Sequence, residues 1–311
     1  MVTNRLRGEV PAPGDMCQPE ERRVGSYGAH VIEDPAVDHD LQLVHRWLRA
    51  LPITDLLSAA VDDAVKYVLD GPRTWRFDLA DPAVDSDERA SVGTKLQYHV
   101  IGRLGLAKEP PLDTSILDVP VEIKGTVGRT WMIPREGQCE VTLLFRINAR
   151  RHTFEVWLMR THRAWLTGGN GNRDLKRSPT AEALRRYALI VVPETSLPPE
   201  PLRQLLPEHL DVVFGPAGLR RRLVALFEAL PEVVIPRGSI AVVGAGLGDP
   251  MKRAREAKAD LRERGLIILV GTWPHERKLA AELGFDISGE AWVAVREESF
   301  GFHGLNVPLP R

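Results

Sequence analysis

A short run of alternating side chains at residues 119–124 constrains this chain more than any other feature. Apolar residues there alternate with Glu122 and Lys124. Side chains of a β-strand point alternately to opposite faces, so the pattern predicts a strand with both charged residues on one face. Asp113 lies nine residues before Glu122, and a short turn before the strand would return it to the same place. The sequence therefore predicts two carboxylates and a lysine that converge at the end of a hairpin.

Such a cluster suits metal-assisted cleavage of a phosphodiester. Carboxylate oxygens are the hard ligands that hold Mg²⁺, and a neighbouring cation helps to position the attacking water. The tripeptide alone is weak evidence, because an acid two residues before a lysine recurs at 174–176, 256–258 and 276–278. The last two copies lie in stretches of helical character, where residues two apart do not share a face. The alternative interpretation of residues 122–124 is a solvated strand face.

Composition limits the class of protein. A length of 311 residues fits one large or two ordinary domains with ample core. Cys17 and Cys139 are too few for a disulfide framework, which favours a reducing compartment, and the cytoplasm is the expected location. We expect no membrane partner, because no apolar stretch approaches membrane-spanning length. The nine histidines show no ligand spacing, so the sequence predicts no zinc site.

The distribution of charge is more informative than the net charge of −1. Residues 146–186 hold ten lysines and arginines against three acids, directly after the predicted acid pair. A basic segment beside a metal-binding acid pair suits a polyanionic substrate. The alternative is a charged, solvated surface in a protein that prefers arginine.

The distribution of proline and glycine predicts that the chain is divided into four parts. Residues 1–34 carry proline, glycine and charges without periodicity and are predicted to form a flexible tail. The run at 193–201 contains four prolines and is the clearest linker. An N-terminal domain is therefore expected over 35–192 and a second domain over 202–311.

Apolar periodicity predicts the elements of the first domain. Helices are expected from the spacing at 41–51, 57–68, 96–104 and 180–187, and strands at 140–147 and 152–159. The third helix carries Gln97.

The second domain reads as helices with short strands, which suits a winged-helix module, although many small α+β folds fit equally well. The glycines of residues 244–248 are spaced much as in a dinucleotide-binding turn, but a plain strand-to-helix turn explains them better. Strands are expected at 240–243, 266–270 and 291–295, and helices at 251–264 and 278–283.

A polar cluster follows the glycine-rich residues 168–171. Asn172, Arg173, Lys176 and Arg177 can together reach base edges and phosphates. This cluster is more specific than the acid-x-lysine tripeptide.

Taken together, these motifs resemble the NaeI-type type II restriction endonucleases, which have a PD-(D/E)xK nuclease core. The resemblance runs from about residue 38 to about residue 285, with matching order and near-matching spacing. It is carried by Asp38-His39-Asp40-Leu41, residues 69–74, Gly93-Thr94, Asp113, Glu122-Ile123-Lys124, residues 172–177, Met251-Lys252-Arg253 and residues 265–269.

The resemblance implies a catalytic site that uses Mg²⁺. Asp113, Glu122 and the carbonyl of Ile123 would hold the metal, and Lys124 would orient or activate water. The family's helix glutamate falls on Gln97, which brings no negative charge, so a second metal would bind more weakly or not at all.

The resemblance also implies the architecture and partners. We expect an α/β (α+β) chain with an N-terminal restriction-endonuclease-like domain, whose mixed sheet is flanked by helices, and a C-terminal helix-turn-helix domain resembling that of CAP. A homodimer would bind two duplexes of double-stranded DNA, one cut and one acting as an activating effector. Asn172 to Arg177 would contact the cut site, and Lys252, Arg253 and Arg255 the second duplex. A cognate DNA methyltransferase would act on the same site without direct contact.

Two other functions stay open at this point. One is a nicking, repair or modification-dependent endonuclease on the same core. The other is a catalytically degenerate DNA-binding protein, which Gln97 favours slightly and the intact Asp113, Glu122 and Lys124 oppose.

Overall fold

The computed structural model describes residues 10–18, 28–168 and 175–306, and these fall into two compact units. The first unit takes its residues from 1–68 and 82–198, and the second from 69–81 and 199–311. The boundary after Pro198 lies inside the predicted linker. Residues 69–81, which the sequence assigned to the first domain, group with the second unit instead.

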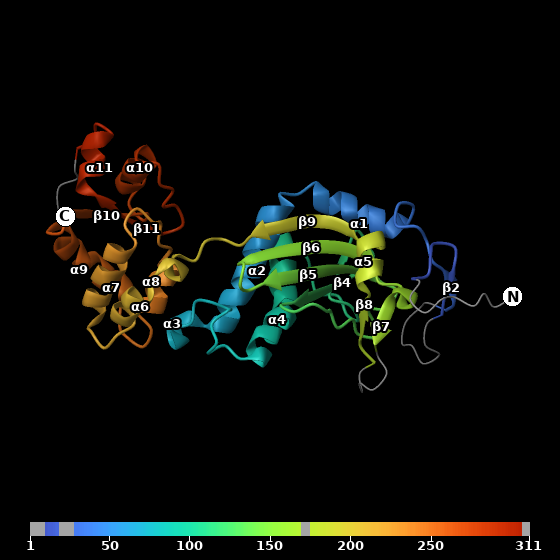
Figure 1. Cartoon of the computed structure of the whole chain (residues 1–311). Coiled ribbons are helices and arrows are strands. Elements are labelled where there is room, and N and C mark those ends of the chain that lie inside the picture. The colour runs from blue at the N-terminus through green and yellow to red at the C-terminus, as the bar shows by residue number, and fades with distance from the viewer. Residues whose placement is uncertain (1–9, 19–27, 169–174, 307–311) are drawn as a thin grey trace. The chain divides into compact units, whose positions relative to one another are not determined.

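A five-stranded mixed sheet organises the first unit, with strand order β3-β4-β5-β6-β9 (Figure 1). Strands β4 and β5 are parallel, and the other neighbours are antiparallel. The predicted strands at 140–147 and 152–159 are confirmed as β5 and β6. The strands are β3 (Thr114–Ile116), β4 (Val119–Thr126), β5 (Val141–Asn148), β6 (Thr153–Arg160) and β9 (Leu189–Ser196).

Strand β9 occupies residues where the sequence predicted the start of the linker. Its Val192 is buried against β6, and the strand lies at the edge of the sheet. An edge strand tolerates Pro193, because a proline facing away from the sheet removes no hydrogen bond from the ladder. The proline-rich composition of 193–201 therefore concealed half of a strand.

Helices flank this sheet, and α1 contacts β6 and β9. Asp38 starts α1 because its carboxylate accepts a hydrogen bond from the Leu41 N–H at 3.0 Å. Gly105 ends α4 with a positive φ of 66°. Among the described residues, no helix is long and apolar enough to cross a membrane. The helices of the first unit are α1 (His39–Arg49), α2 (Ile53–Leu69, whose last residue falls in the second unit), α4 (Ser86–Leu104) and α5 (Ala181–Tyr187).

Two glycines bring α4 and β4 together. A Cβ atom on Gly93 of α4 would lie 2.3 Å from the carbonyl oxygen of Gly125 in β4. Only glycine permits this approach of a helix backbone to a strand backbone. The contact therefore holds the helix that carries Gln97 against the strand that carries Glu122 and Lys124.

The described part of the N-terminal segment is ordered against the core. β1 (Met16–Cys17) pairs antiparallel with β2 (His30–Val31), and the side chains of Cys17 and Ile32 are fully or almost fully buried. The prediction of a flexible tail over 1–34 does not hold for residues 10–18 and 28–34. Isolated buried residues leave no periodicity in the sequence, which is why the pattern missed them.

Each unit also contains short elements. The first three named here belong to the first unit, and the last two to the second. They are η1 (Arg163–Trp165), β7 (Leu166–Gly168), β8 (Arg177–Pro179), η2 (Pro201–Gln204) and α3 (Gly71–Thr74).

The second unit is mostly helical, with one two-stranded antiparallel sheet. Its apolar core lies between α7, α8, α9 and that sheet. The elements are α6 (Pro207–Val213), α7 (Leu219–Ala229), α8 (Arg237–Val243), α9 (Pro250–Arg262), β10 (Leu266–Val270), α10 (Pro274–Glu282), β11 (Trp292–Arg296) and α11 (Glu297–Phe302).

The sequence prediction for this unit is wrong at one element. Residues 240–243 are part of helix α8 and not of a strand. A run of four apolar residues has no period that separates a buried helix from a buried strand. The glycine-rich turn at 244–248 therefore follows a helix, which removes the strand that a dinucleotide-binding turn requires. The predicted strand at 266–270 and the predicted helix near 251–264 are confirmed as β10 and α9.

The glycine contact gives a stability prediction. Gly93→Ala should lower the free energy of unfolding by about 1–3 kcal/mol, because the new methyl group meets backbone that cannot rotate away. Gly102→Ala is the matched control in the same helix, because nothing lies within 4 Å of its added Cβ. Alanine there should be neutral or stabilising by up to about 1 kcal/mol. Urea unfolding of both variants measures the difference, and equal stabilities would show that the backbone approach is not tight.

Candidate functional site

The predicted acid pair and lysine meet at the β3–β4 hairpin. Asp113 immediately precedes β3, and its Oδ2 accepts a hydrogen bond from the Ile123 N–H of β4 at 2.9 Å. Lys124 Nζ lies 2.5 Å from Glu122 Oε1 and 4.0 Å from Asp113 Oδ2. The alternation in β4 and the turn before it thus produce the cluster that the sequence predicted.

Both carboxylates are buried, so the strand face is not a solvated one. Asp113 is 6% exposed and Glu122 is 3% exposed, whereas Lys124 remains half-buried. The pKa of Glu122 is raised to about 7, mainly by burial, with the charges of Asp113 and Glu136 adding to the rise and Lys124 opposing it. A buried acid whose charged form is disfavoured in this way gains from a bound cation.

Gln97 reaches the same cluster from α4. Its hydrogen-bond partners assign the amide orientation: the nitrogen donates to Asp113, at 3.2 Å from Oδ2, and the oxygen accepts from Lys108 Nζ at 3.2 Å. Gln97 therefore holds the Asp113 carboxylate as a neutral donor. A glutamate in its place would set a third carboxylate against Asp113.

Lys108 belongs to the cluster, although the sequence did not single it out. Its Nζ lies 3.7 Å from Asp113 Oδ1 and 4.7 Å from the centre of the Tyr98 ring. The only signal available was its position five residues before Asp113, in a loop with no pattern of its own. Two lysines therefore face Asp113 in this structure.

A loop packs against Glu122 and links it to the predicted DNA-contacting segment. A Cβ on Gly137 would lie 3.1 Å from Glu122 Cγ, and the neighbouring Gln138 donates to the Leu175 carbonyl at 3.3 Å. Arg177 is held in turn by backbone hydrogen bonds to Ile133, at 2.7 Å and 3.0 Å. These hydrogen bonds hold Leu175 and Arg177, on either side of Lys176, against the loop that packs on Glu122. Asn172 and Arg173 lie outside the described residues.

Three predicted basic residues lie on α9 of the second unit. Lys252, Arg253 and Arg255 are exposed, whereas Ala254, Ala257 and Leu261 of the same helix are buried in the core. Arg253 forms an ion pair of 2.7 Å with Glu256. The helix thus presents a basic face to solvent.

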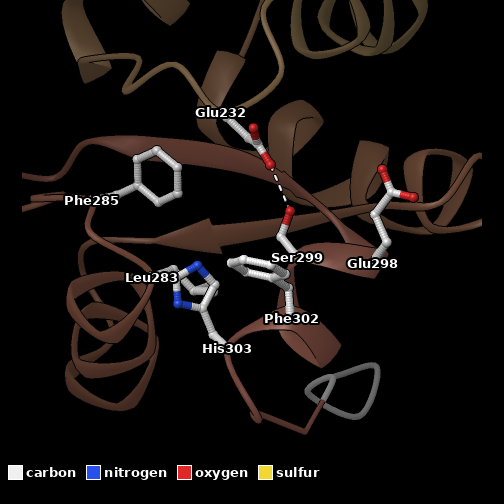
Figure 2. A pocket seen from close by; sticks show the side chains of 7 residues that line it. All are labelled: Glu232, Leu283, Phe285, Glu298, Ser299, Phe302 and His303. Atoms are coloured by element: carbon white, nitrogen blue, oxygen red, sulfur yellow. Dashed lines mark hydrogen bonds between the residues drawn. The ribbon is translucent and has the colours of Figure 1, made fainter.

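A hollow on the second unit contains none of the predicted site residues. Figure 2 shows Ser299 donating a hydrogen bond of 2.7 Å to Glu232 at its edge. None of its lining residues, all within the described part of the chain, is a lysine or an arginine, so it does not suit a phosphate. The lining residues are Glu232, Leu283, Phe285, Glu298, Ser299, Phe302 and His303.

Comparison with known proteins gives one family. A family model described as restriction endonuclease NaeI matches residues 41–304, nearly the whole chain, and this range contains the complete Asp113 cluster. No curated protein matches the chain.

The raised pKa of Glu122 gives a prediction for the metal-free protein. A folded-state pKa above the unfolded value means that the unfolded chain releases the proton more readily, so stability falls as pH rises from about 4.5 through about 7. Glu122→Gln removes this ionisation. In EDTA, the variant should gain roughly 2–3 kcal/mol over the native chain between pH 5 and pH 8. Urea unfolding at both pH values measures this, and a difference that does not change with pH would contradict the assignment.

Proposed function

The chain belongs to the NaeI restriction endonuclease family, whose members are site-specific deoxyribonucleases, and we propose that it is a Mg²⁺-dependent type II enzyme that cuts both strands of DNA. The observation that carries this proposal is the buried pair of Asp113 and Glu122 with Lys124 beside it, at one hairpin inside the matched range.

Restriction endonucleases generally use divalent metal ions, and the residues of this cluster fit one. Asp113, Glu122 and the carbonyl of Ile123 would hold Mg²⁺, because hard oxygen donors are what this ion prefers. The burial of two carboxylates, which disfavours their charged forms, supports a cation there in addition to Lys108 and Lys124. When bound, the ion supplies a Lewis acid for the scissile phosphate.

The side chains of this cluster have separate roles. Lys124 orients the attacking water and offsets the negative charge that develops on the phosphate. The attacking water loses a proton as its oxygen forms the new bond to phosphorus, the opposite P–O bond breaks, and the leaving oxygen takes up a proton. Gln97 is a positioning residue that holds Asp113 without adding charge, so any second metal would bind weakly.

Basic residues near the acid pair would contact the DNA that is cut. Lys176 and Arg177 follow the glycine-rich loop, and the hydrogen bonds at Leu175 and Ile133 fix this segment beside the loop that packs on Glu122. Phosphate contacts from such residues would set the register of the duplex. Asn172 and Arg173 complete the proposed contact.

The second unit contains three helices followed by two antiparallel strands, and this order supports the proposal of a winged-helix domain with a second DNA site. Helices α7, α8 and α9 are followed by β10 and β11, and Ile235, between α7 and α8, bridges to Trp292 of β11. Helix α9 would be the recognition helix, with Lys252, Arg253 and Arg255 on the duplex. One departure is that α10 lies between β10 and β11, where a winged helix has a short wing. A homodimer would then read a palindrome and bind a second, activating duplex.

The active site is tested by variants that preserve the fold. Asp113→Asn keeps an oxygen that can accept from the Ile123 N–H, but it removes the charge that holds the metal. It should cut plasmid DNA at least about 100-fold more slowly with Mg²⁺, and Lys124→Ala should do the same. Both should bind DNA as the native chain does in a gel-shift assay.

Asp118→Asn is the matched control for this experiment. Asp118 is an exposed acid in the turn of the same hairpin, so it undergoes the same chemical change away from the cluster. It should cut at the native rate. Full cleavage by Asp113→Asn would refute the assignment. If even the native chain binds DNA but does not cut it, the result would favour the catalytically degenerate DNA-binding protein.

The effector proposal predicts faster cutting of a plasmid with two sites than of one with a single site. An added oligonucleotide carrying the site should rescue the slow substrate. Lys252→Ala with Arg253→Ala should remove this rescue and lower the salt dependence of binding by about one unit of slope per lost phosphate contact. Lys278→Ala is the control, because it removes an exposed lysine from α10 of the same unit. Equal rates on both plasmids, unaffected by the oligonucleotide, would rule out the effector model.

A further inference from the structure

Two cysteines and two histidines of the first unit meet in a cluster separate from the acid pair. Cys17 comes from β1, His30 from β2, Cys139 from the residues just before β5, and His162 from those just after β6. One ligand atom from each lies within 4.8 Å of all the others. The cysteines and His162 are buried, and His30 is half-buried.

The separations fit a single tetrahedral ion. Two thiolates that each lie about 2.3 Å from one zinc stand about 3.8 Å apart, and the sulfur atoms of Cys17 and Cys139 are 3.7 Å apart. Two imidazole nitrogens on the same ion stand about 3.4 Å apart, and His30 Nε2 lies 3.1 Å from His162 Nδ1. A disulfide would need sulfur atoms about 2.05 Å apart.

The surroundings orient these side chains as ligands. His30 Nδ1 lies 3.0 Å from the Gly28 carbonyl, which requires the proton on Nδ1 and leaves the Nε2 lone pair directed at the cluster. The Arg163 backbone N–H donates to Cys139 Sγ at 3.4 Å, as outer donors do for a metal-bound thiolate. His162 packs at right angles to Trp165, with ring centres 4.7 Å apart, and this fixes its ring plane.

The backbone at Cys139 also indicates that its side chain is required. Its φ is +70°, a conformation that glycine adopts freely and that costs other residues free energy. A strained non-glycine residue points to a role for the side chain that a glycine would not fill.

We propose that Cys17, His30, Cys139 and His162 bind one Zn²⁺ ion as a structural site. Two soft thiolates and two imidazoles are the donor set that zinc takes in such sites. Four protein ligands leave no open position for water or substrate, so the ion stabilises structure and does not catalyse. Binding displaces two thiol protons, and the resulting centre of one Zn²⁺, two thiolates and two neutral imidazoles carries no net charge, which suits burial.

The ion would anchor the N-terminal segment to the nuclease core. Strands β1 and β2 pair over two residues each, and a pair this short is not stable by itself. Through Cys139, the ion would also hold the end of the loop whose Gly137 packs on Glu122. The site is not implied by family membership, because Cys17 and His30 precede the matched range of 41–304.

The metal content of the full-length protein tests this proposal. Purified under reducing conditions without chelator, the native chain should carry about one zinc per chain by elemental mass spectrometry. Cys17→Ser and His30→Ala should lose it. His303→Ala should keep it, because His303 is an exposed histidine of the second unit. Replacement by Co²⁺ should give the intense visible bands of tetrahedral coordination and a thiolate charge-transfer band, both absent in Cys17→Ser.

The structural consequence is measured by hydrogen exchange. Removal of zinc by a chelator should speed amide exchange in residues 28–34, with β10 of the second unit as the unaffected reference. The proposal is overturned if reduced protein reconstituted with zinc retains none after gel filtration, or if Cys17→Ser binds as much as the native chain. A Cys17–Cys139 disulfide in freshly purified, zinc-free protein would also overturn it.

Discussion

The hydrogen bond from the Ile123 N–H to the Asp113 carboxylate is the contact on which the proposed active site depends. It joins the residue before β3 to the middle of β4, so the hairpin cannot form without bringing Asp113 beside Glu122 and Lys124. The bond also holds the backbone of Ile123, whose carbonyl we propose as a metal ligand. Burial of both acids disfavours their charged forms, and the pKa of Glu122 stays raised although Lys124 lies beside it.

The sequence predicted the centre of this site because the information is local. Alternation in residues 119–124 places Glu122 and Lys124 on one face, and the short distance to Asp113 allows only a hairpin. The sequence did not reveal Lys108 or the packing of Gly137 on Glu122, because these depend on how loops fold back onto β4. The burial of Glu122, which changes its pKa, likewise depends on the rest of the sheet.

The errors in the fold have the same origin. Residues 240–243 are helical because α7 and α9 surround them, and their apolar run is equally compatible with a strand. The end of β9 was hidden because its Pro193 opens a proline-rich run that continues beyond the strand. The Cys17 and Cys139 pair was invisible because 122 positions separate its members, and metal-ligand spacing is recognisable only when ligands lie close in sequence. The helix at 240–243 and the proposed zinc site both depend on contacts between residues that are distant in sequence, which a local pattern does not reveal.

Mapping of DNA ends shows whether this protein is a site-specific endonuclease. Plasmid DNA is digested with the full-length protein and Mg²⁺, and both strands of every fragment end are sequenced. We expect all ends to fall at one short, two-fold symmetric sequence, both strands to be cut, and EDTA to abolish cutting. Ends scattered over many sequences, nicks confined to one strand, or cutting that persists in EDTA would contradict it.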